Sequence, residues 1–179
     1  TLTIRAMTTQ AEVIDSGLLA EYCPILRETA LQIADPQIRN LGTIGGNVNQ
    51  DTRCWYYRGG WPCYRAGGNI CYANTATSLN REHAILDANR CVAVSPSDTA
   101  PALIALDARM VVRNRRGERE IEAEEYFLGP ATDIRRMTVL KTGEILTAIR
   151  IPNTWANAQF YFEKVSDRNS WDFPLSNVA

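Results

Sequence analysis

The segment from residue 50 to residue 90 constrains the fold of this chain more than any other feature. It is rich in Trp, Tyr, Cys, Gly, Asn and Arg, and its apolar residues follow neither the period of a helix nor that of a strand. A loop of this length inside a compact domain is unusual unless something ties it down. A metal cluster bound by thiolates would do so, and four of the five cysteines lie in or directly after this segment: Cys54, Cys63, Cys71 and Cys91.

The length and charge of the chain exclude several classes of protein. With 179 residues, it is long enough for one ordinary domain with a hydrophobic core. The net charge of −1 gives no support for nucleic acid as a partner. No apolar run approaches the roughly 20 residues that cross a bilayer, so we expect no membrane span. The chain starts at Thr1 without a Met and stops at Ala179 with no closing element, and we expect an excised piece of a longer protein.

The cysteines indicate a reducing compartment. Five is an odd number, which argues against a closed set of disulfides. Residues 1–5 lack the apolar stretch of a signal peptide, and we therefore place the protein in the cytoplasm, where thiols stay reduced or bind metal. Cys23 lies apart from the other four in a stretch with helical character, and we expect it to be a small buried hydrophobic residue.

Helical and strand signals occur on both sides of the cysteine-rich segment and predict an α+β fold, with a mixed sheet and flanking helices. Thr9 and Glu12 have the spacing of a capping box at the start of a helix. The Asp35-Pro36 pair should end a helix that starts at Pro24, because a residue before proline avoids helical geometry. Gly117 should supply the positive φ of a hairpin turn. The predicted helices are residues 24–34 and a helix capped by Ser97 or Asp98; the predicted strands are residues 2–4, 110–113, 118–121, 144–151 and 159–165.

A second informative feature stands directly before the cysteine-rich segment: the run Thr43-Ile44-Gly45-Gly46-Asn47. Two adjacent glycines allow backbone N–H groups to converge on an anion, because no Cβ blocks the approach and positive φ is accessible. Thr43 and Asn47 add side-chain donors. The run matches neither the Rossmann fingerprint nor the P-loop, and a plain turn is the alternative interpretation. A phosphate-binding turn beside candidate cluster ligands would favour electron transfer.

Four stretches, in order, resemble the FAD-binding (medium) subunit of the molybdenum hydroxylases, the xanthine dehydrogenase family. Residues 37–47 resemble its second flavin-contacting loop, and residues 95–103 resemble its Ser-Pro-x-Ser-Asp helix start. Residues 143–152 resemble a strand beside the isoalloxazine ring, and residues 162–165 resemble the strand that carries a flavin-facing lysine. The resemblance implies the central part of a PCMH-type, vanillyl-alcohol-oxidase-like FAD-binding domain. The first flavin-binding segment of that family lies upstream of everything present here, so the chain would carry only part of the FAD site.

The resemblance also implies roles for individual residues. Asp98 would accept hydrogen bonds from hydroxyl groups of the flavin nucleotide, Leu146 would pack near the ring system, and Lys164 would donate toward its pyrimidine edge. The alternatives are a helix N-cap for Asp98, a core position for Leu146 and a solvated strand position for Lys164. The residues expected to hold the pyrophosphate and adjacent groups of FAD are Thr43, Ile44, Gly45, Gly46 and Asn47.

The cysteine-rich insertion resembles that of the 4-hydroxybenzoyl-CoA reductase FAD subunit, where cysteines bind a 4Fe-4S cluster. The shared elements are residues 65–71 and the flanking thiols, although the 19 residues between Cys71 and Cys91 make a longer last gap. Four thiolates suit a 4Fe-4S cubane, one per iron, whereas structural zinc usually uses close Cys pairs that are absent here. Zinc and free cysteines remain the alternatives. We expect His83 to be a polar residue of the insertion, and the aromatic residues around the cysteines to shield the cluster.

These observations predict a FAD-binding electron-transfer subunit of a molybdenum enzyme, without an acid–base or nucleophilic catalyst of its own. Residues 1–152 would form the second subdomain of the FAD-binding domain, interrupted by the insertion at residues 51–92, and residues 153–179 would start the C-terminal subdomain. The implied partners are a molybdopterin-binding large subunit and a 2Fe-2S small subunit. The alternative function is a non-redox scaffold or interaction module whose insertion holds a structural zinc or no metal.

Overall fold

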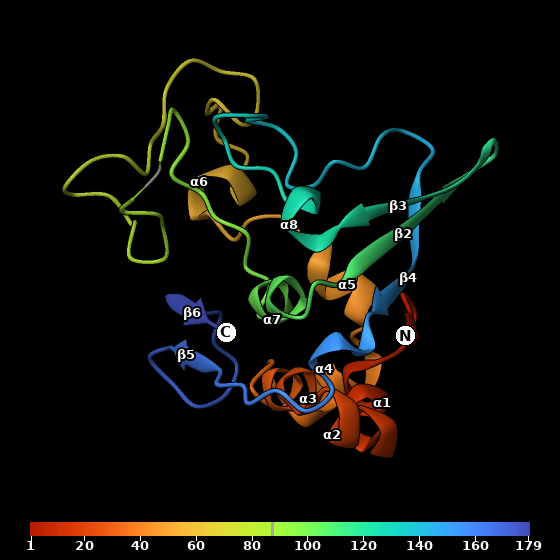
Figure 1. Ribbon diagram of the computed structural model, residues 1–179. Helices are drawn as coiled ribbons and strands as arrows, with labels where there is room; N and C mark the ends of the chain where they lie inside the picture. The colour runs from red at the N-terminus through yellow and green to blue at the C-terminus, as the bar shows by residue number, and fades with distance from the viewer. Residues whose placement is uncertain (87) are drawn as a thin grey trace. The chain divides into compact units, whose positions relative to one another are not determined.

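The computed structural model describes residues 1–86 and 88–179, and the chain divides into two compact units. The first, here called the sheet unit, consists of residues 1–49, 97–126 and 140–179. The second, here called the cysteine unit, consists of residues 50–96 and 127–139. The chain thus leaves the sheet unit before the cysteine-rich insertion and returns to the sheet unit after it (Figure 1).

Four strands form the main sheet of the sheet unit, in the order β1-β4-β2-β3 (Figure 1). Among the described residues every strand pair is antiparallel, so the expectation of a mixed sheet is wrong. The predicted hairpin of β2 and β3 is confirmed, and Gly117 turns the chain with a φ of 151°. The bounds are Leu2–Arg5 for β1, Arg109–Asn114 for β2, Gly117–Glu122 for β3 and Ile145–Ile151 for β4.

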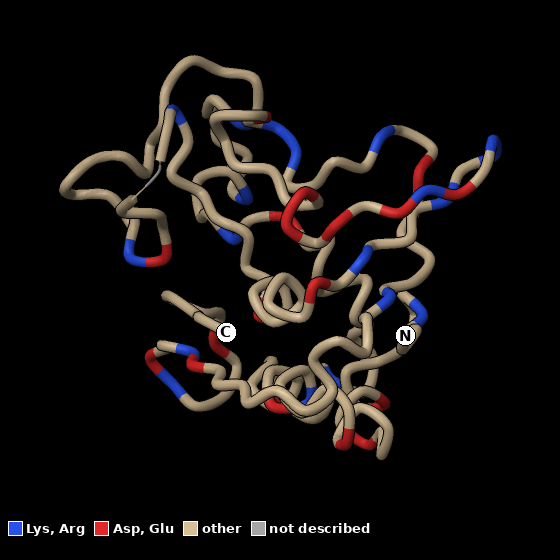
Figure 2. Tube along the Cα trace, viewed as in Figure 1, with Lys and Arg blue, Asp and Glu red and all other residues tan. Residues whose placement is uncertain are grey.

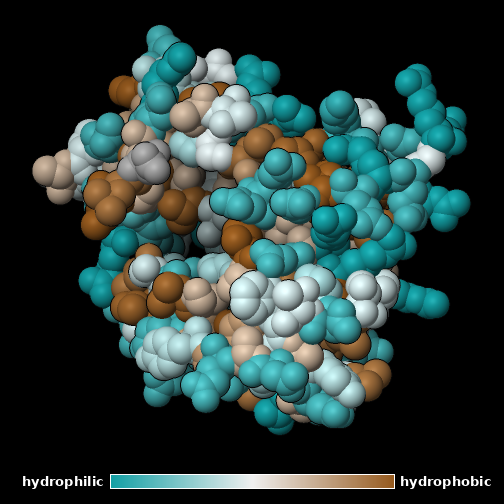
Figure 3. All heavy atoms as spheres, in the orientation of Figure 1, coloured by the Kyte–Doolittle hydropathy of each residue, from teal (hydrophilic) through white to brown (hydrophobic). Residues whose placement is uncertain are grey.

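Strand β3 is the exposed edge of this sheet, and charge protects it. Its side chains are exposed except at Ile121, and basic and acidic residues alternate along the hairpin (Figure 2). Arg150 of β4 forms an ion pair with Glu120, and Arg109 lies 3.6 Å from Glu122. Hydrophilic side chains also cover the hairpin tip in Figure 3. Charged side chains on an edge strand oppose unwanted pairing with another chain.

Short helices pack beside the sheet, and α1, α2 and α3 lie next to one another (Figure 1). The predicted capping box is confirmed: the Thr9 side chain accepts from the Glu12 N–H, and the Glu12 carboxylate accepts from the Thr9 N–H at 2.7 Å. The helices are α1 Gln10–Asp15, α2 Gly17–Tyr22, α3 Pro24–Leu31, α4 Pro36–Leu41, α5 Ile44–Val48, α6 Trp55–Arg58, α7 Thr99–Ala105 and α8 Ala123–Tyr126, and Asn153–Trp155 is a 3-10 turn.

Two predicted boundaries are wrong. Helix α3 ends at Leu31 rather than at residue 34, because Ala34 has a left-handed φ of 43°. Asp35 then opens a new helix instead of only ending the first: its Oδ1 accepts from the Ile38 N–H at 2.8 Å, and Pro36 takes the first helical position. The strand predicted over residues 159–165 is limited to β5, Glu163–Val165, which pairs with β6, Ser176–Val178.

The hydrophobic core of the sheet unit lies between the sheet and the helices. Cys23 is part of it with only 3% of its surface exposed, which confirms the expectation of a small buried residue. No helix among the described residues has the length and apolar character needed to cross a membrane. Core residues with no exposed surface include Ile25, Leu26, Ile44, Leu103, Leu106, Met110, Tyr126, Ile149 and Ile151.

Gly45 is the point where helix α5 touches the chain after β1. Its N–H donates to the Ala6 carbonyl at 2.8 Å, and a Cβ on Gly45 would lie 2.6 Å from the same oxygen. We expect Gly45→Ala to lower the free energy of unfolding by about 1–3 kcal/mol, because backbone must move to admit the methyl group. Urea unfolding measures this, with Gly17→Ala as the control, since a Cβ there meets nothing within 4 Å. Equal stability of the two variants would contradict the assigned close approach.

Candidate functional site

The run Thr43-Ile44-Gly45-Gly46-Asn47 is the start of a helix rather than a loop. Thr43 is the N-cap of α5, and its Oγ1 accepts from the Gly46 N–H at 3.0 Å. Ile44 and Gly45 are buried, whereas Gly46 is exposed. Of the two glycines, only Gly46 is therefore exposed, in the first turn of the helix.

The backbone donors of this segment are already used within the protein. Each N–H from residue 44 to residue 47 is bonded internally, and the predicted binding of an anion by this segment stays a prediction. What remains for a ligand is the exposed edge at Gly46, where no Cβ limits the approach. The acceptors are Thr8 O for Ile44 at 2.8 Å, Ala6 O for Gly45 at 2.8 Å, Thr43 Oγ1 for Gly46 at 3.0 Å and Thr43 O for Asn47 at 2.9 Å.

The Asn47 side chain joins α5 to the start of α7. Its Oδ1 accepts from the hydroxyls of Ser97 and Thr99, both at 2.7 Å. Three polar side chains thus meet although Asn47 is 50 positions from Ser97 and 52 from Thr99. Asn47 was predicted as a donor to a ligand, but its oxygen is an acceptor inside the protein. Sequence reasoning missed the two hydroxyls as its partners, although they flank Asp98 within the recognised 95–103 motif.

Asp98 occupies the N-cap position of α7 without capping it. Its side chain makes no cap hydrogen bond, and the Ser97 hydroxyl accepts from the Ala100 N–H at 3.2 Å instead. The carboxylate is buried and lies 3.1 Å from Lys164 Nζ, with only 4% of each side chain exposed. Burial raises the pKa of Asp98 to about 6, and the neighbouring Lys164 offsets only part of that effect.

Lys164 is a buried connector and not a solvated strand residue. Besides facing Asp98, its Nζ donates to the carbonyls of Gln32 at 2.9 Å and Asp172 at 2.8 Å. Its ammonium group therefore makes two hydrogen bonds to backbone oxygens and one ion pair with a carboxylate. The side chain of Lys164 is thus engaged within the chain, and its predicted contact with the flavin ring stays a prediction.

Leu146 takes its alternative role as a core residue. It lies on β4 opposite Val112 of β2, and 9% of its surface is exposed. The remaining predicted flavin residues form one connected group: the first turn of α5, the Asn47 side chain, the start of α7 with Asp98, and Lys164. The structure thus brings together residues that are up to about 120 positions apart, from Thr43 to Lys164.

The four predicted cluster ligands line one pocket of the cysteine unit. All are free thiols; Cys63 and Cys91 are buried, and Cys54 and Cys71 are half-buried. Other residues of the pocket wall are Tyr57, Tyr64, Arg65, Tyr72 and Arg90. Among residues 1–86 and 88–179, no three His, Cys, Asp or Glu side chains stand close enough to hold a single metal ion.

Turns bring the thiols to this pocket. Cys54 precedes the single helical turn α6, and the chain then folds back on itself: the Tyr64 N–H donates to Ile70 O at 2.9 Å and the Gly68 N–H to Cys63 O at 2.8 Å. Gly68 is required here, because a Cβ would overlap the Pro62 carbonyl oxygen. This hairpin-like loop brings Cys63, just before the 65–71 motif, and Cys71, at its end, to the same pocket.

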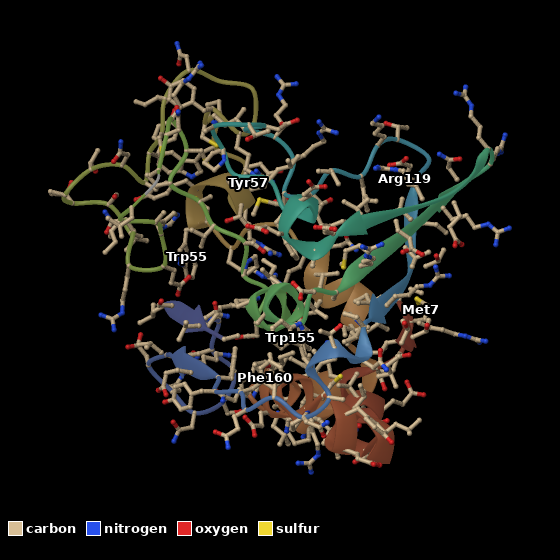
Figure 4. All side chains as sticks on the ribbon, viewed as in Figure 1. Met7, Trp55, Tyr57, Arg119, Trp155 and Phe160 are labelled. Carbon is tan, nitrogen blue, oxygen red and sulfur yellow. The ribbon has the colours of Figure 1, made fainter. Side chains whose placement is uncertain are left out.

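Aromatic side chains provide the small core of the cysteine unit. Tyr56 and Trp61 meet edge to face at 5.3 Å between ring centroids, and Trp61 and Tyr72 do so at 4.8 Å. Tyr57 faces the pocket, whereas Trp55 is 66% exposed; Figure 4 shows these two side chains leaving α6 in different directions. Of the five aromatic residues expected to shield the cluster, Tyr56, Tyr57 and Tyr64 line the pocket, whereas Trp55 and Trp61 do not.

Charge around the pocket acts on the Cys91 thiol. Burial raises the pKa of Cys91, and the neighbouring Cys71 and Cys54 thiols act in the same direction. The hydrogen bond from the Ala93 backbone and the charge of Arg65 lower that pKa in opposition. His83 stands apart: it lines another surface pocket with Trp55, and burial lowers its pKa.

Comparison with known proteins identifies the family. Residues 1–154 match the family model described as the FAD binding domain in molybdopterin dehydrogenase. The chain belongs to this family. Its fold agrees: the structure superimposes with a TM-score of 0.64 and 30% identity, over 96% of this chain and 43% of the other, on the reconstituted CO dehydrogenase from Oligotropha carboxidovorans. The α+β fold class of a PCMH-type FAD-binding domain is confirmed.

Two curated relatives illustrate the family. The aldehyde oxidoreductase FAD-binding subunit PaoB of Escherichia coli is 33% identical over 87% of this chain and 49% of its own length. The carbon monoxide dehydrogenase medium chain of Afipia carboxidovorans is 33% identical over 98% of this chain and 44% of its own length. The chain thus spans about half the length of the curated relatives it matches.

The buried carboxyl of Asp98 gives a pH-dependent prediction. Its pKa is about 6 in the folded state and about 3.9 in an unfolded chain, so the folded state retains a proton that the unfolded state has lost. Stability from this group is therefore fully present below the unfolded pKa and lost as pH rises through the folded one. Relative to Asp98→Asn, the wild type should lose up to about 3 kcal/mol of unfolding free energy between about pH 4 and about pH 7. Urea unfolding across this range measures the difference, and a pH-independent difference would contradict the assignment.

Proposed function

We propose that this chain is part of the FAD-binding electron-transfer subunit of a molybdenum-containing hydroxylase or dehydrogenase. Membership of the FAD-binding family carries the proposal. The subunit would work with a molybdopterin-binding large subunit and a 2Fe-2S small subunit, in the cytoplasm. Flavin accepts electrons singly or in pairs, so it suits a junction between iron–sulfur clusters and an external electron acceptor or donor.

The connected polar group of the sheet unit supports part of a FAD site. Gly46 is the exposed position where a phosphate can approach the start of α5, and Thr43 and Asn47 stand beside it. Asp98 would accept from nucleotide hydroxyls, and Lys164 would add positive charge near the ring. A cation near the reduced ring favours its anionic form. In this proposal Ile44, Gly45 and Leu146 shape the site from the core.

The pocket of the four cysteines supports a second cofactor, a 4Fe-4S cluster. Four free thiols line it, and a buried guanidinium lies beside them. A cubane takes one thiolate per iron, so its ligands stand farther apart than those around a single zinc, where each sulfur is about 2.3 Å from the metal. The four cysteines are also well separated in sequence, whereas structural zinc usually uses close Cys pairs. The enzyme would be of the xanthine dehydrogenase or the 4-hydroxybenzoyl-CoA reductase type.

Gly46→Val in the full-length protein tests the flavin site. We expect loss of most of the bound FAD, because a branched side chain would occupy the exposed edge where a phosphate approaches and would restrict φ. Flavin absorbance per polypeptide measures the occupancy, with Gly17→Val as a control at an open position outside α5. Undiminished FAD in the Gly46 variant would remove the pyrophosphate assignment.

Cys71→Ser in the full-length, anaerobically purified complex tests the cluster. Serine keeps the size but is a far poorer iron ligand, because its hydroxyl stays protonated near neutral pH. Iron and acid-labile sulfide should fall by about four atoms each per subunit, since a cubane holds four of each. Cys23→Ala should keep both, because Cys23 lies in the core of the sheet unit.

The absorbance spectrum of the wild-type complex distinguishes an electron-transfer subunit from a scaffold or interaction module. Flavin and iron–sulfur absorbance bands support the electron-transfer subunit, whereas a colourless complex would leave the scaffold or interaction module. Normal iron in Cys71→Ser, with an unchanged paramagnetic-resonance spectrum, would show that this thiol is not a ligand.

A further inference from the structure

One charged side chain is built into the wall of the cysteine pocket. Arg65 lines the pocket together with all four cysteines, and only 4% of its side chain is exposed. Arginine is almost never buried without a partner, since removing its charge from water is costly. Its position inside the recognised 65–71 motif does not by itself explain why a cation should stand there.

The partners of Arg65 hold it in place without cancelling its charge at the pocket. Asp51 Oδ1 accepts from one terminal nitrogen at 2.5 Å, and the Ile134 carbonyl accepts from the other at 3.0 Å. The Tyr57 ring lies 5.1 Å from the guanidinium carbon. Asp51 is 49% exposed and is not part of the pocket wall, so water screens the carboxylate more than it screens the buried cation.

One donor of Arg65 has no acceptor among the described residues. Its Nε is buried and makes no hydrogen bond with any residue that the structure describes. A buried N–H without an acceptor costs free energy, and a bound group with acceptor atoms would remove that cost. The sulfur atoms of a cluster and its cysteine ligands are such acceptors, and hydrogen bonds to them are among the factors that set a cluster's potential.

We propose that Arg65 sets the reduction potential of the cluster in the cysteine pocket, with its charge and its Nε–H favouring the reduced form. The proposal rests on the 4Fe-4S assignment made above. Reduction adds one electron, taken from a one-electron donor, and no bond or proton changes place. A cluster held by four thiolates would go from a net charge of −2 to −3, and a buried cation would stabilise the more negative state more strongly.

Arg90 provides a natural comparison within the same pocket. It also lines the wall, but it is exposed and lies over the Tyr64 ring with its guanidinium carbon 6.0 Å from the centroid. Solvent screens an exposed charge far more than a buried one. Of these two arginines, Arg65 should therefore have the larger electrostatic effect on the reduction potential of the cluster.

The experiment is a redox titration of the full-length complex with dithionite, followed by paramagnetic resonance. We expect Arg65→Gln to keep its iron and to lower the reduction equilibrium constant at least tenfold, about 59 mV for a one-electron couple. Arg65→Lys keeps the positive charge but loses the guanidinium group. Its reduction potential should lie between those of Arg65→Gln and the wild type. Arg58→Gln, which removes an exposed charge from α6 outside the pocket wall, should leave the potential unchanged.

A second variant, expected to shift the reduction potential in the opposite direction, keeps the proposal testable if Arg65→Gln does not fold. Asp51→Asn removes the carboxylate that partly balances Arg65, so the cluster should become easier to reduce and its potential should rise. A fall or no change in that variant overturns the proposal. So does an iron-loaded Arg65→Gln with the wild-type potential. A wild-type complex without iron and sulfide would instead overturn the cluster assignment itself, which separates the two failures.

Discussion

The contact of Asn47 with Ser97 and Thr99 holds the architecture of the sheet unit together. The chain leaves this unit after Asn49 and returns at Ser97, and these hydrogen bonds close that excursion at its base. Closing a loop of this length costs conformational entropy, although the cost grows only slowly with length. The closure uses side chains of the sheet unit alone, and no residue of the insertion takes part in these two hydrogen bonds.

The same closure sets the electrostatics of the candidate flavin region. It places the start of α7 next to α5, so that Asp98 is buried and must be balanced by Lys164. Burial of one charge without the other would be strongly unfavourable, and the pair therefore depends on both segments being in position. The raised pKa of Asp98 shows that burial outweighs the attraction of the lysine. A carboxyl with a pKa of about 6 can donate a hydrogen bond when it is protonated and only accept one when it is ionised.

Local signals in the sequence predicted much of the fold. The capping box at Thr9 and the hairpin at Gly117 were predictable, because each depends on side chains a few positions apart. The end of α3 was not, because Ala34 adopts a left-handed conformation that its residue type does not favour. The glycine run predicts free N–H groups, whereas in the structure the carbonyls of Ala6 and Thr8 accept hydrogen bonds from two of them. These partners lie far from the run in sequence, so its own residues do not predict them.

The cysteine unit presents the opposite case, since composition predicted its grouping of thiols while no periodic pattern predicted its path. Apart from the α6 turn, it has little regular structure among its described residues, and its packing depends on three aromatic rings, the Arg65–Asp51 pair and Gly68. A unit this small buries little apolar surface, and comparable small folds are commonly stabilised by disulfides or metals. Its thiols are free, so disulfides do not supply that stability. A cluster bound by the four thiolates would link turns up to 37 positions apart, and its binding free energy would contribute directly to the folding of the unit.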